Sequence, residues 1–114
     1  MAVSPTPDGP LTPAEFQVLV ALADGEKHGY AIGKEVARRT DGQVLLRAAT
    51  LYTVIKRLLA GALIEESPAR PDPALDDERR RYYRLTDRGR SVAIAEAHRL
   101  EQTLAQARTK LGLI

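Results

Sequence analysis

The sequence of 114 residues has no cysteine and no tryptophan, and it has only one phenylalanine and four tyrosines. Without cysteine, disulfides, thiol nucleophiles and thiolate-bound zinc or iron–sulfur sites are excluded. The two histidines, His28 and His98, fall on separate predicted helices without a partner motif. We therefore expect no enzyme, no cofactor and no metal site. His28 is expected to form a local hydrogen bond beside Gly29, and His98 to lie on an exposed helix surface.

Long apolar runs are also missing from the sequence. No stretch approaches the roughly 20 apolar residues of a membrane span, and residues 1–10 lack the basic start and the apolar stretch of a signal peptide. A cytoplasmic protein without membrane contact is therefore expected. Residues 1–10 contain three prolines and no apolar periodicity, which predicts a disordered N-terminal lead-in.

The net charge is small, but the charged residues are segregated along the chain. The formal net charge is +2, yet residues 34–57 carry +4 and residues 79–90 carry +5, whereas residues 58–78 carry −5. Such blocks are typical both of ordinary solvated faces and of surfaces that attract a polyanion. Their meaning therefore depends on the predicted elements that carry them.

Apolar periodicity predicts three short helices. The first begins at Thr12-Pro13-Ala14-Glu15, where Thr12 and Glu15 can form a capping box, and it ends at Asp24-Gly25. The second is expected from Tyr30 to Arg39, with Ile32, Val36 and Ala37 facing inward. The third has the clearest apolar stripe, and Gly61 lies where it should stop; the stripe consists of Leu51, Ile55, Leu58, Leu59 and Ala62.

The first helix is apolar on more than one side. Its predicted core stripe is Phe16, Leu19, Val20 and Ala23. Val18 and Leu22 add apolar surface on the flank of that stripe. We expect Val18, Leu22 or neighbouring residues of this helix to be covered by a second copy of the chain.

A β-hairpin and a long final helix complete the predicted elements. Strands are expected at 63–66 and 80–85, with Tyr83 and Leu85 facing the core, and residues 67–79 form a long tip with three prolines. Thr86 can cap a helix that continues to about Lys110. Apolar residues of this helix are spaced alternately by four and three, as in a two-helix seam; they are Ala93, Ala97, Leu100, Leu104, Ala107 and Leu111.

The final helix has two interpretations. It could be a lone arm that packs on its own domain. Its outer positions stay polar while the seam is apolar, and this favours dimerisation; the outer positions are Glu96, Arg99, Glu101, Arg108 and Lys110.

This order of elements predicts a mainly α fold with a small β-hairpin, that is, a winged helix-turn-helix with a long C-terminal dimerisation helix. Residues 11–86 would form the winged helix-turn-helix DNA-binding domain, and residues 87–114 the dimerisation helix. In such a domain the third helix enters the major groove, and the hairpin contacts the DNA backbone beside it.

The side of the third helix opposite its core stripe fits this role. It carries small, hydroxyl and basic residues and no acidic one; they are Ala49, Thr50, Thr53, Lys56, Arg57 and Ala60. Hydroxyls near the helix start can reach bases or phosphates, and the basic side chains suit phosphates. Tyr52 either donates its hydroxyl to a phosphate or is a plain half-buried tyrosine. Arg79, Arg80 and Arg81 on the return strand would flank the groove.

Several of these residues together resemble the signature of PadR-like transcriptional regulators. The similarity covers about residues 11–111, and the short tail resembles the compact branch of the family. The matching residues are Leu51-Tyr52, Leu58, Gly61, Leu63-Ile64, the run Arg81-Tyr82-Tyr83-Arg84-Leu85-Thr86-Asp87-Arg88-Gly89, and His28-Gly29-Tyr30 at the entry to the second helix.

The resemblance implies a homodimer that binds a pseudo-palindromic operator in double-stranded DNA. Such proteins usually repress transcription and are released by a small-molecule effector or another signal. The resemblance also implies which side chains face DNA; they are Tyr30, Lys34, Thr50, Tyr52, Thr53 and Lys56.

Two features depart from the family pattern. The hairpin tip is unusually long, and its acidic residues Asp76, Asp77 and Glu78 would be repelled by phosphate, so the tip is expected to bend away from DNA. The scarcity of aromatic residues leaves little to stack against a flat inducer.

A winged helix that binds proteins rather than DNA is the alternative, because a fold alone does not determine function. The non-acidic face of the third helix, in combination with the arginine cluster, favours DNA.

Overall fold

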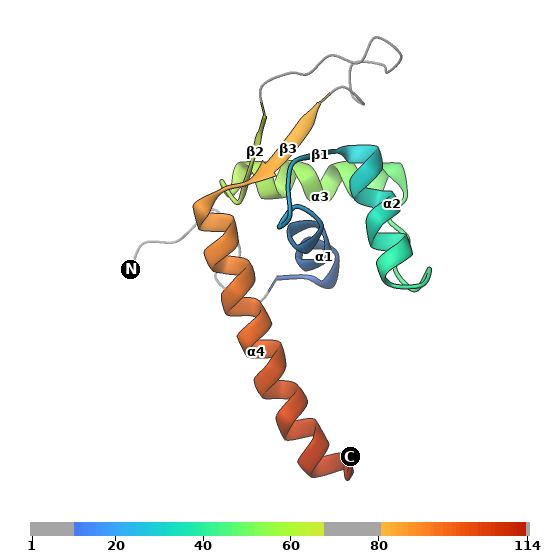
Figure 1. Ribbon diagram of the computed structural model, residues 1–114, viewed down its shortest axis with the longest axis vertical. Helices are drawn as coiled ribbons and strands as arrows, with labels where there is room; N and C mark the ends of the chain where they lie inside the picture. Colours follow the sequence, from blue (N-terminus) through green and yellow to red (C-terminus); the bar gives the residue numbers. More distant parts are fainter. Residues whose placement is uncertain (1–10, 68–80, 114) are drawn as a thin grey trace.

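The computed structural model describes residues 11–67 and 81–113. The elements follow in the order α1 (Pro13–Ala21), β1 (Lys27–His28), α2 (Gly29–Arg39), α3 (Ala48–Ala60), β2 (Ile64–Glu66), β3 (Tyr82–Leu85) and α4 (Asp87–Leu111). Helices α1 to α3 and the sheet form one body, from which α4 extends (Figure 1). The predicted fold class, a mainly α winged helix-turn-helix with a long C-terminal helix, is confirmed.

Helix α1 begins as predicted. The Thr12 hydroxyl accepts a hydrogen bond from the Glu15 N–H at 3.1 Å, and the Glu15 carboxylate accepts one from the Thr12 N–H at 2.8 Å. Pro13 occupies the first helical position, where its missing N–H costs nothing. The capping box therefore fixes where the helix starts.

The buried side of α1 differs from the predicted one. Val18 and Leu22, expected on a flank available to a second copy, are 0% and 1% exposed within this chain's own core. Their assignment to a dimer interface was therefore wrong. Of the predicted stripe only Leu19 is buried; Phe16 and Val20 are half-buried and Ala23 is exposed. The helix is apolar almost all round, so periodicity could not identify its inner side.

Helices α2 and α3 bury the residues that their periodicity indicates. Ile32 and Val36 of α2 are fully buried, and Ala37 is half-buried. In α3, the buried side chains are Leu51, Val54, Ile55 and Leu58. Leu59 is only half-buried. Ala62 was predicted in the stripe but is exposed, because α3 ends at Ala60 and Ala62 has a φ of +59° in the turn that follows.

The sheet has three antiparallel strands in the order β1-β3-β2. Strands β2 and β3 form the predicted hairpin, with Ile64 opposite Leu85. Strand β1 was not predicted; its two residues pair Lys27 with Tyr83 and His28 with Tyr82. Tyr83 is buried and Leu85 half-buried, so the predicted inward pair lies on the core side. The sheet thus joins the start of α2 to the wing.

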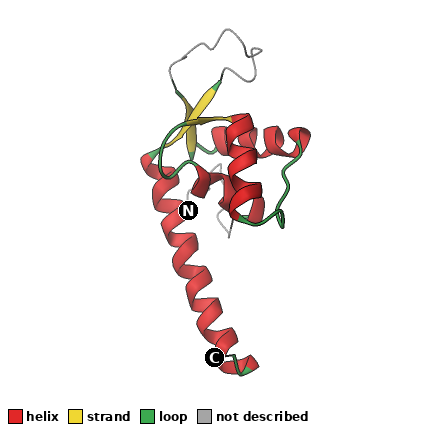
Figure 2. Cartoon of the chain, turned by 45° about the vertical axis from the view of Figure 1, so that its right-hand side comes forward, coloured by secondary structure: helices red, strands yellow, loops and turns green. Residues whose placement is uncertain are grey.

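Helix α4 packs on the domain only through its first turns. Thr86 caps it as predicted, by accepting from the Gly89 N–H at 2.9 Å. From His98 onward the described side chains are exposed except for the half-buried Ala107. Both views show these turns leading away from the other elements (Figures 1 and 2). Within residues 11–67 and 81–113, no helix has the length and apolar character needed to cross a membrane.

Candidate nucleic-acid interface

The outer side of α3 is exposed along the whole helix. All six side chains predicted to point away from the core are exposed; they are Ala49, Thr50, Thr53, Lys56, Arg57 and Ala60. The Thr53 hydroxyl donates to the Ala49 carbonyl at 2.9 Å, so toward solvent it offers only acceptor lone pairs and a methyl group. None of the exposed side chains of α3 is acidic. A polyanion can therefore approach this side closely.

A cleft of about 360 Å³ separates α3 from the wing. Lys56 of α3 and Arg81, just before β3, line it from opposite elements, and Tyr52 and Tyr83 contribute to its wall. Both cationic side chains are exposed. Arg81, predicted from sequence as a wing residue, is thus next to the outer side of α3. Arg79, Arg80 and the acidic residues of the tip lie outside the described residues.

Tyr52 turns its hydroxyl toward the start of α2. A Cβ atom built on Gly29 would lie 2.6 Å from the Tyr52 hydroxyl oxygen and 3.0 Å from its ring carbon Cζ. Any other residue at position 29 would require the Tyr52 side chain to shift. Tyr52 is half-buried, which favours the interpretation of Tyr52 as a packing residue between α2 and α3.

The His28-Gly29-Tyr30 motif joins α2 to the wing. His28 Nδ1 accepts from the Ala31 N–H at 3.2 Å and caps α2, which confirms the predicted local hydrogen bond. The His28 ring meets Tyr82 of β3 edge-on, with centroids 5.4 Å apart, and stacks near Tyr30 at 6.4 Å. The motif therefore sets the position of α2 relative to the sheet.

A second cleft, of about 500 Å³, runs along the outer side of α2. Tyr30 is 57% exposed there, and the Lys34 ammonium lies 5.3 Å from the centre of its ring. Arg47, at the N-cap of α3, lines the same cleft and was not singled out from the sequence. A basic residue immediately before a DNA-facing helix is the signal that would have indicated it. Both clefts include Ala48, so they adjoin.

Arg57 differs from Lys56 in having a carboxylate partner. One guanidinium nitrogen of Arg57 lies 2.9 Å from a carboxylate oxygen of Glu15, which is 1% exposed. The same carboxylate accepts from the Thr12 N–H. Glu15 therefore connects the start of α1 to α3, and the charge of Arg57 is balanced inside the molecule.

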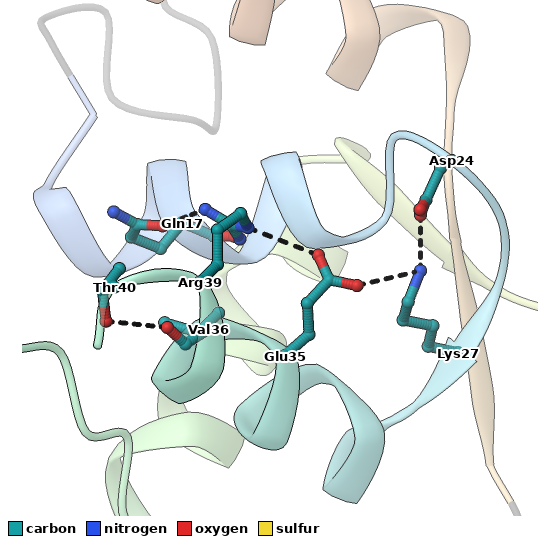
Figure 3. Close-up of polar contacts among 7 residues, drawn as sticks. All are labelled: Gln17, Asp24, Lys27, Glu35, Val36, Arg39 and Thr40. Atoms are coloured by element: carbon teal, nitrogen blue, oxygen red, sulfur yellow. Dashed lines mark hydrogen bonds and ion pairs between the residues drawn. The ribbon is translucent and has the colours of Figure 1, made fainter. Parts of the chain in front are cut away.

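Cations near the end of α1 are balanced in the same way (Figure 3). The Lys27 ammonium lies 2.5 Å from Asp24 and 3.5 Å from Glu35, and the Arg39 guanidinium contacts both Glu35 and Gln17. The Lys27 hydrogen bond lowers the pKa of Asp24 below its ordinary value. This network ties α2 to α1 and leaves little net charge on that side.

The predicted seam of α4 forms an apolar strip on its exposed turns. Leu100, Leu104 and Leu111 are 41%, 48% and 71% exposed. At the base of the helix the strip continues into a shallow groove of about 140 Å³ between α1 and α4, lined by Phe16, Val20, Ala93, Ile94 and Ala97 among others. The apolar surface contributed by α1 is therefore Phe16 and Val20 rather than Val18 and Leu22.

Glu96 was predicted on the outer side of α4 but is only 7% exposed. Hydrogen bonding from Arg99 holds the pKa of this carboxyl below its ordinary value, and the Leu11 backbone N–H adds to the effect. Glu96 therefore fastens α4 to the chain just before α1. From the sequence, an acidic residue on the polar side of a helix is expected to be exposed, so the contact of Glu96 with Leu11 could not be predicted.

The comparisons with known proteins agree with this arrangement. Residues 18–95 match the model of the transcriptional regulator PadR-like family. An uncharacterized protein of Lysinibacillus sphaericus is 32% identical over 74 residues, which make up 65% of each chain, so the match spans slightly less than two thirds of that relative.

Two solved structures share the fold. A transcriptional regulator from Clostridium thermocellum is 25% identical, with a TM-score of 0.70 over 84% of this chain and 87% of that one. A PadR family transcription regulator from Clostridium difficile is 22% identical, with a TM-score of 0.72 over 88% of this chain and 99% of that one, and this second likeness concerns the fold alone. The family consists of transcriptional regulators rather than enzymes. By sequence and by architecture, this chain belongs to the PadR-like family of transcriptional regulators.

Proposed function

We propose that this chain binds double-stranded DNA as a homodimer in the cytoplasm, with α3 of each protomer in a major groove, and that it represses transcription from a pseudo-palindromic operator. The outer side of α3 carries the proposal. It presents hydroxyls and Lys56 but no carboxylate, and Arg81 of the wing lines the adjacent cleft. Threonines near the start of the helix would meet base edges, and the cations would meet phosphates.

The outer side of α2 extends the proposed interface. Tyr30, Lys34 and the newly identified Arg47 line a cleft that adjoins the one between α3 and the wing. Their cations would contact the backbone next to the groove that α3 enters. Arg79 and Arg80 would add charge on the wing, as the sequence predicts.

Dimerisation would cover the apolar strip of α4. The exposed leucines lie on the turns of α4 that lead away from the other elements (Figure 1), and the strip continues into the groove that Phe16 and Val20 line. The expected interface residues are Ala93, Ala97, Leu100, Leu104, Ala107 and Leu111, with Phe16, Val20 and Ile94 in place of Val18 and Leu22. Two-fold symmetry would place two α3 helices on one side of the dimer, and half-sites about 10 or 20 base pairs apart.

Analytical ultracentrifugation at micromolar concentration tests the dimer. Leu104→Glu should yield a monomer, because a charge at the centre of the strip cannot be buried without a partner. Gln106→Glu is the matched control, since it adds the same charge at an exposed position on another side of α4. A monomeric wild-type protein, or a dimeric Leu104→Glu variant, would contradict the proposed interface.

Repression is tested with a reporter gene behind the promoter that the purified protein protects in footprinting. Deletion of the regulator should raise reporter expression. Lower expression on deletion would identify an activator instead.

A further inference from the structure

The run Thr86-Asp87-Arg88-Gly89, part of the family signature, lies away from the outer side of α3. It forms the link between β3 and α4, and three of its residues contact the backbone of residues 61–63, where α3 ends. The DNA-binding role proposed above does not account for these contacts. They concern how α3 and α4 are held relative to each other.

Thr86 forms hydrogen bonds both to the first turn of α4 and to the turn that follows α3. Its hydroxyl accepts from the Gly89 N–H at 2.9 Å and so caps α4. The same hydroxyl lies 2.7 Å from the Ala62 carbonyl oxygen and 3.0 Å from the Leu63 carbonyl oxygen, and these two acceptors share its single proton. The Thr86 N–H also donates to the Leu63 carbonyl at 3.1 Å. Thr86, the N-cap residue of α4, is therefore hydrogen-bonded to the turn that follows α3.

Arg88 and Gly89 complete this joint. The Arg88 Nε–H donates at 3.1 Å to the carbonyl of Gly61, the C-cap of α3, where the last carbonyls of a helix lack partners of their own. A Cβ on Gly89 would lie 1.9 Å from the Leu63 carbonyl oxygen, so only glycine lets α4 approach this closely. Ala62, between Gly61 and Leu63, has a φ of +59°, a left-handed conformation that costs free energy in an L-residue.

These contacts leave little freedom between the two helices. Any change in the angle between α3 and α4 would break the bonds of Thr86 and Arg88 to residues 61–63, or would press Gly89 into the Leu63 carbonyl. Helix α4 carries the strip through which the protomers are proposed to pair, so the joint is present twice in a dimer. The distance between the two α3 helices would then depend on it.

We propose that Thr86, Arg88 and Gly89 are positioning residues that fix the angle between α3 and α4, and thereby set the half-site spacing that the dimer accepts. The inference rests on the proposed function as a dimeric DNA-binding protein. It assigns the Thr-x-Arg-Gly run to selection of operator geometry rather than to DNA contact.

Selection from a pool of random duplexes of about 40 base pairs tests this assignment. The wild-type protein should enrich one half-site spacing, whereas Arg88→Ala should enrich two or more spacings that share the same half-site. Lys110→Ala, which removes a charge from the exposed end of α4, is the control and should select as the wild type does. A single, unchanged spacing for Arg88→Ala would overturn the inference. Failure of the wild-type protein to enrich any duplex would overturn the proposed function instead.

A distance measurement without DNA covers the case in which Arg88→Ala selects no sequence. The chain has no cysteine, so Ala60→Cys in the last turn of α3 gives one spin-label site per protomer. Double electron–electron resonance on the labelled dimer should give a narrow distribution of distances between the two labels. Arg88→Ala should at least double the width of that distribution. Thr86→Val should act likewise, whereas Thr86→Ser, which keeps the hydroxyl, should not. Equal widths for all variants would overturn the inference.

Discussion

The two sides of α3 have the same formal charge in the sequence but present different charges to a partner. Lys56 lies on the side toward the wing and shares a cleft with Arg81, and no carboxylate is among the described residues of that cleft. Arg57 lies on the side toward α1 and is paired with the buried Glu15 at 2.9 Å. The wing side is therefore cationic, whereas the α1 side is close to neutral and carries the hydroxyls of Thr50 and Thr53.

Because of this difference, we expect the two sides of α3 to have different roles in DNA binding. A cation that has no carboxylate partner among residues 11–67 and 81–113 gains most from a phosphate, because it releases counterions from DNA without losing a bond to one of these residues. A neutral side with hydroxyl and methyl groups is suited to base edges, which carry sequence information. We therefore expect the wing side to supply affinity and the α1 side to supply specificity.

The largest effect is expected from removal of the cations on the wing side. Lys56→Ala combined with Arg81→Ala removes four phosphate partners per dimer, so the slope of log affinity against log salt should fall by about 3.6, and affinity for any duplex by at least about 100-fold. Fluorescence anisotropy with a random-sequence duplex at several salt concentrations measures both. Lys110→Ala should match the wild type. An unchanged slope in the double variant would show that the wing side does not bind phosphates.

Next in size is the cost of leaving Glu15 without its partner. Arg57→Met should lower the free energy of unfolding by about 2 kcal/mol, because the buried carboxylate keeps its charge and loses the guanidinium. Adding Glu15→Gln should restore most of that loss in urea denaturation.

The same Glu15→Gln/Arg57→Met protein should keep the wild-type salt slope, since a neutral pair has been replaced by two neutral residues. A slope lower by about 1.8 would mean that Arg57 contacts phosphate directly and that the two sides of α3 are alike.

Glu15→Gln alone should strengthen DNA binding. Glutamine still serves in a capping box, so the start of α1 is kept while Arg57 loses its counter-charge. Affinity for any duplex should rise up to about 10-fold, and the salt slope should steepen by about 1.8. Glu101→Gln, on the exposed end of α4, controls for the overall change in charge. Weaker binding by Glu15→Gln, with an intact fold by circular dichroism, would argue that the pair holds α3 in its binding position.

The smallest effect is expected at Thr53, on the specificity side. Its proton is used by the Ala49 carbonyl, so the hydroxyl can only accept from a base, as adenine N6 or cytosine N4 would allow. Thr53→Val should lose that preference, by about 1 kcal/mol, without a change in salt slope, whereas Thr53→Ser should keep it. Competition among operator variants measures this. Loss in Thr53→Ser but not in Thr53→Val would indicate that the methyl group, which valine keeps, is read instead of the hydroxyl.

The sequence predicted the elements of this fold well and their pairing less well. The capping box at Thr12, the outer side of α3 and the cap at Thr86 were predictable because each depends on residues close in sequence. The burial of Val18 and Leu22 was not, since α1 is apolar almost all round and only its neighbours decide which side is covered. Strand β1 has two residues, too few for any alternation.

The roles of acidic residues were the hardest to predict. Glu15 was recognised as a capping residue, but its bond to Arg57 joins positions far apart in the sequence. Glu96 looked like an ordinary surface residue and is buried against Leu11. Net charges summed along the chain therefore overstate the positive charge that α3 presents to a partner. Ion pairs between residues far apart in the sequence, such as Arg57 and Glu15, cannot be predicted from one sequence.

Binding of the purified wild-type protein to a random-sequence duplex, titrated from low to physiological salt, tests the central claim most directly. The account predicts a complex at low salt whose affinity falls linearly on a log–log scale, with a slope that reflects several phosphate contacts per dimer. Absence of a complex at low salt, or an affinity that does not depend on salt, would contradict it.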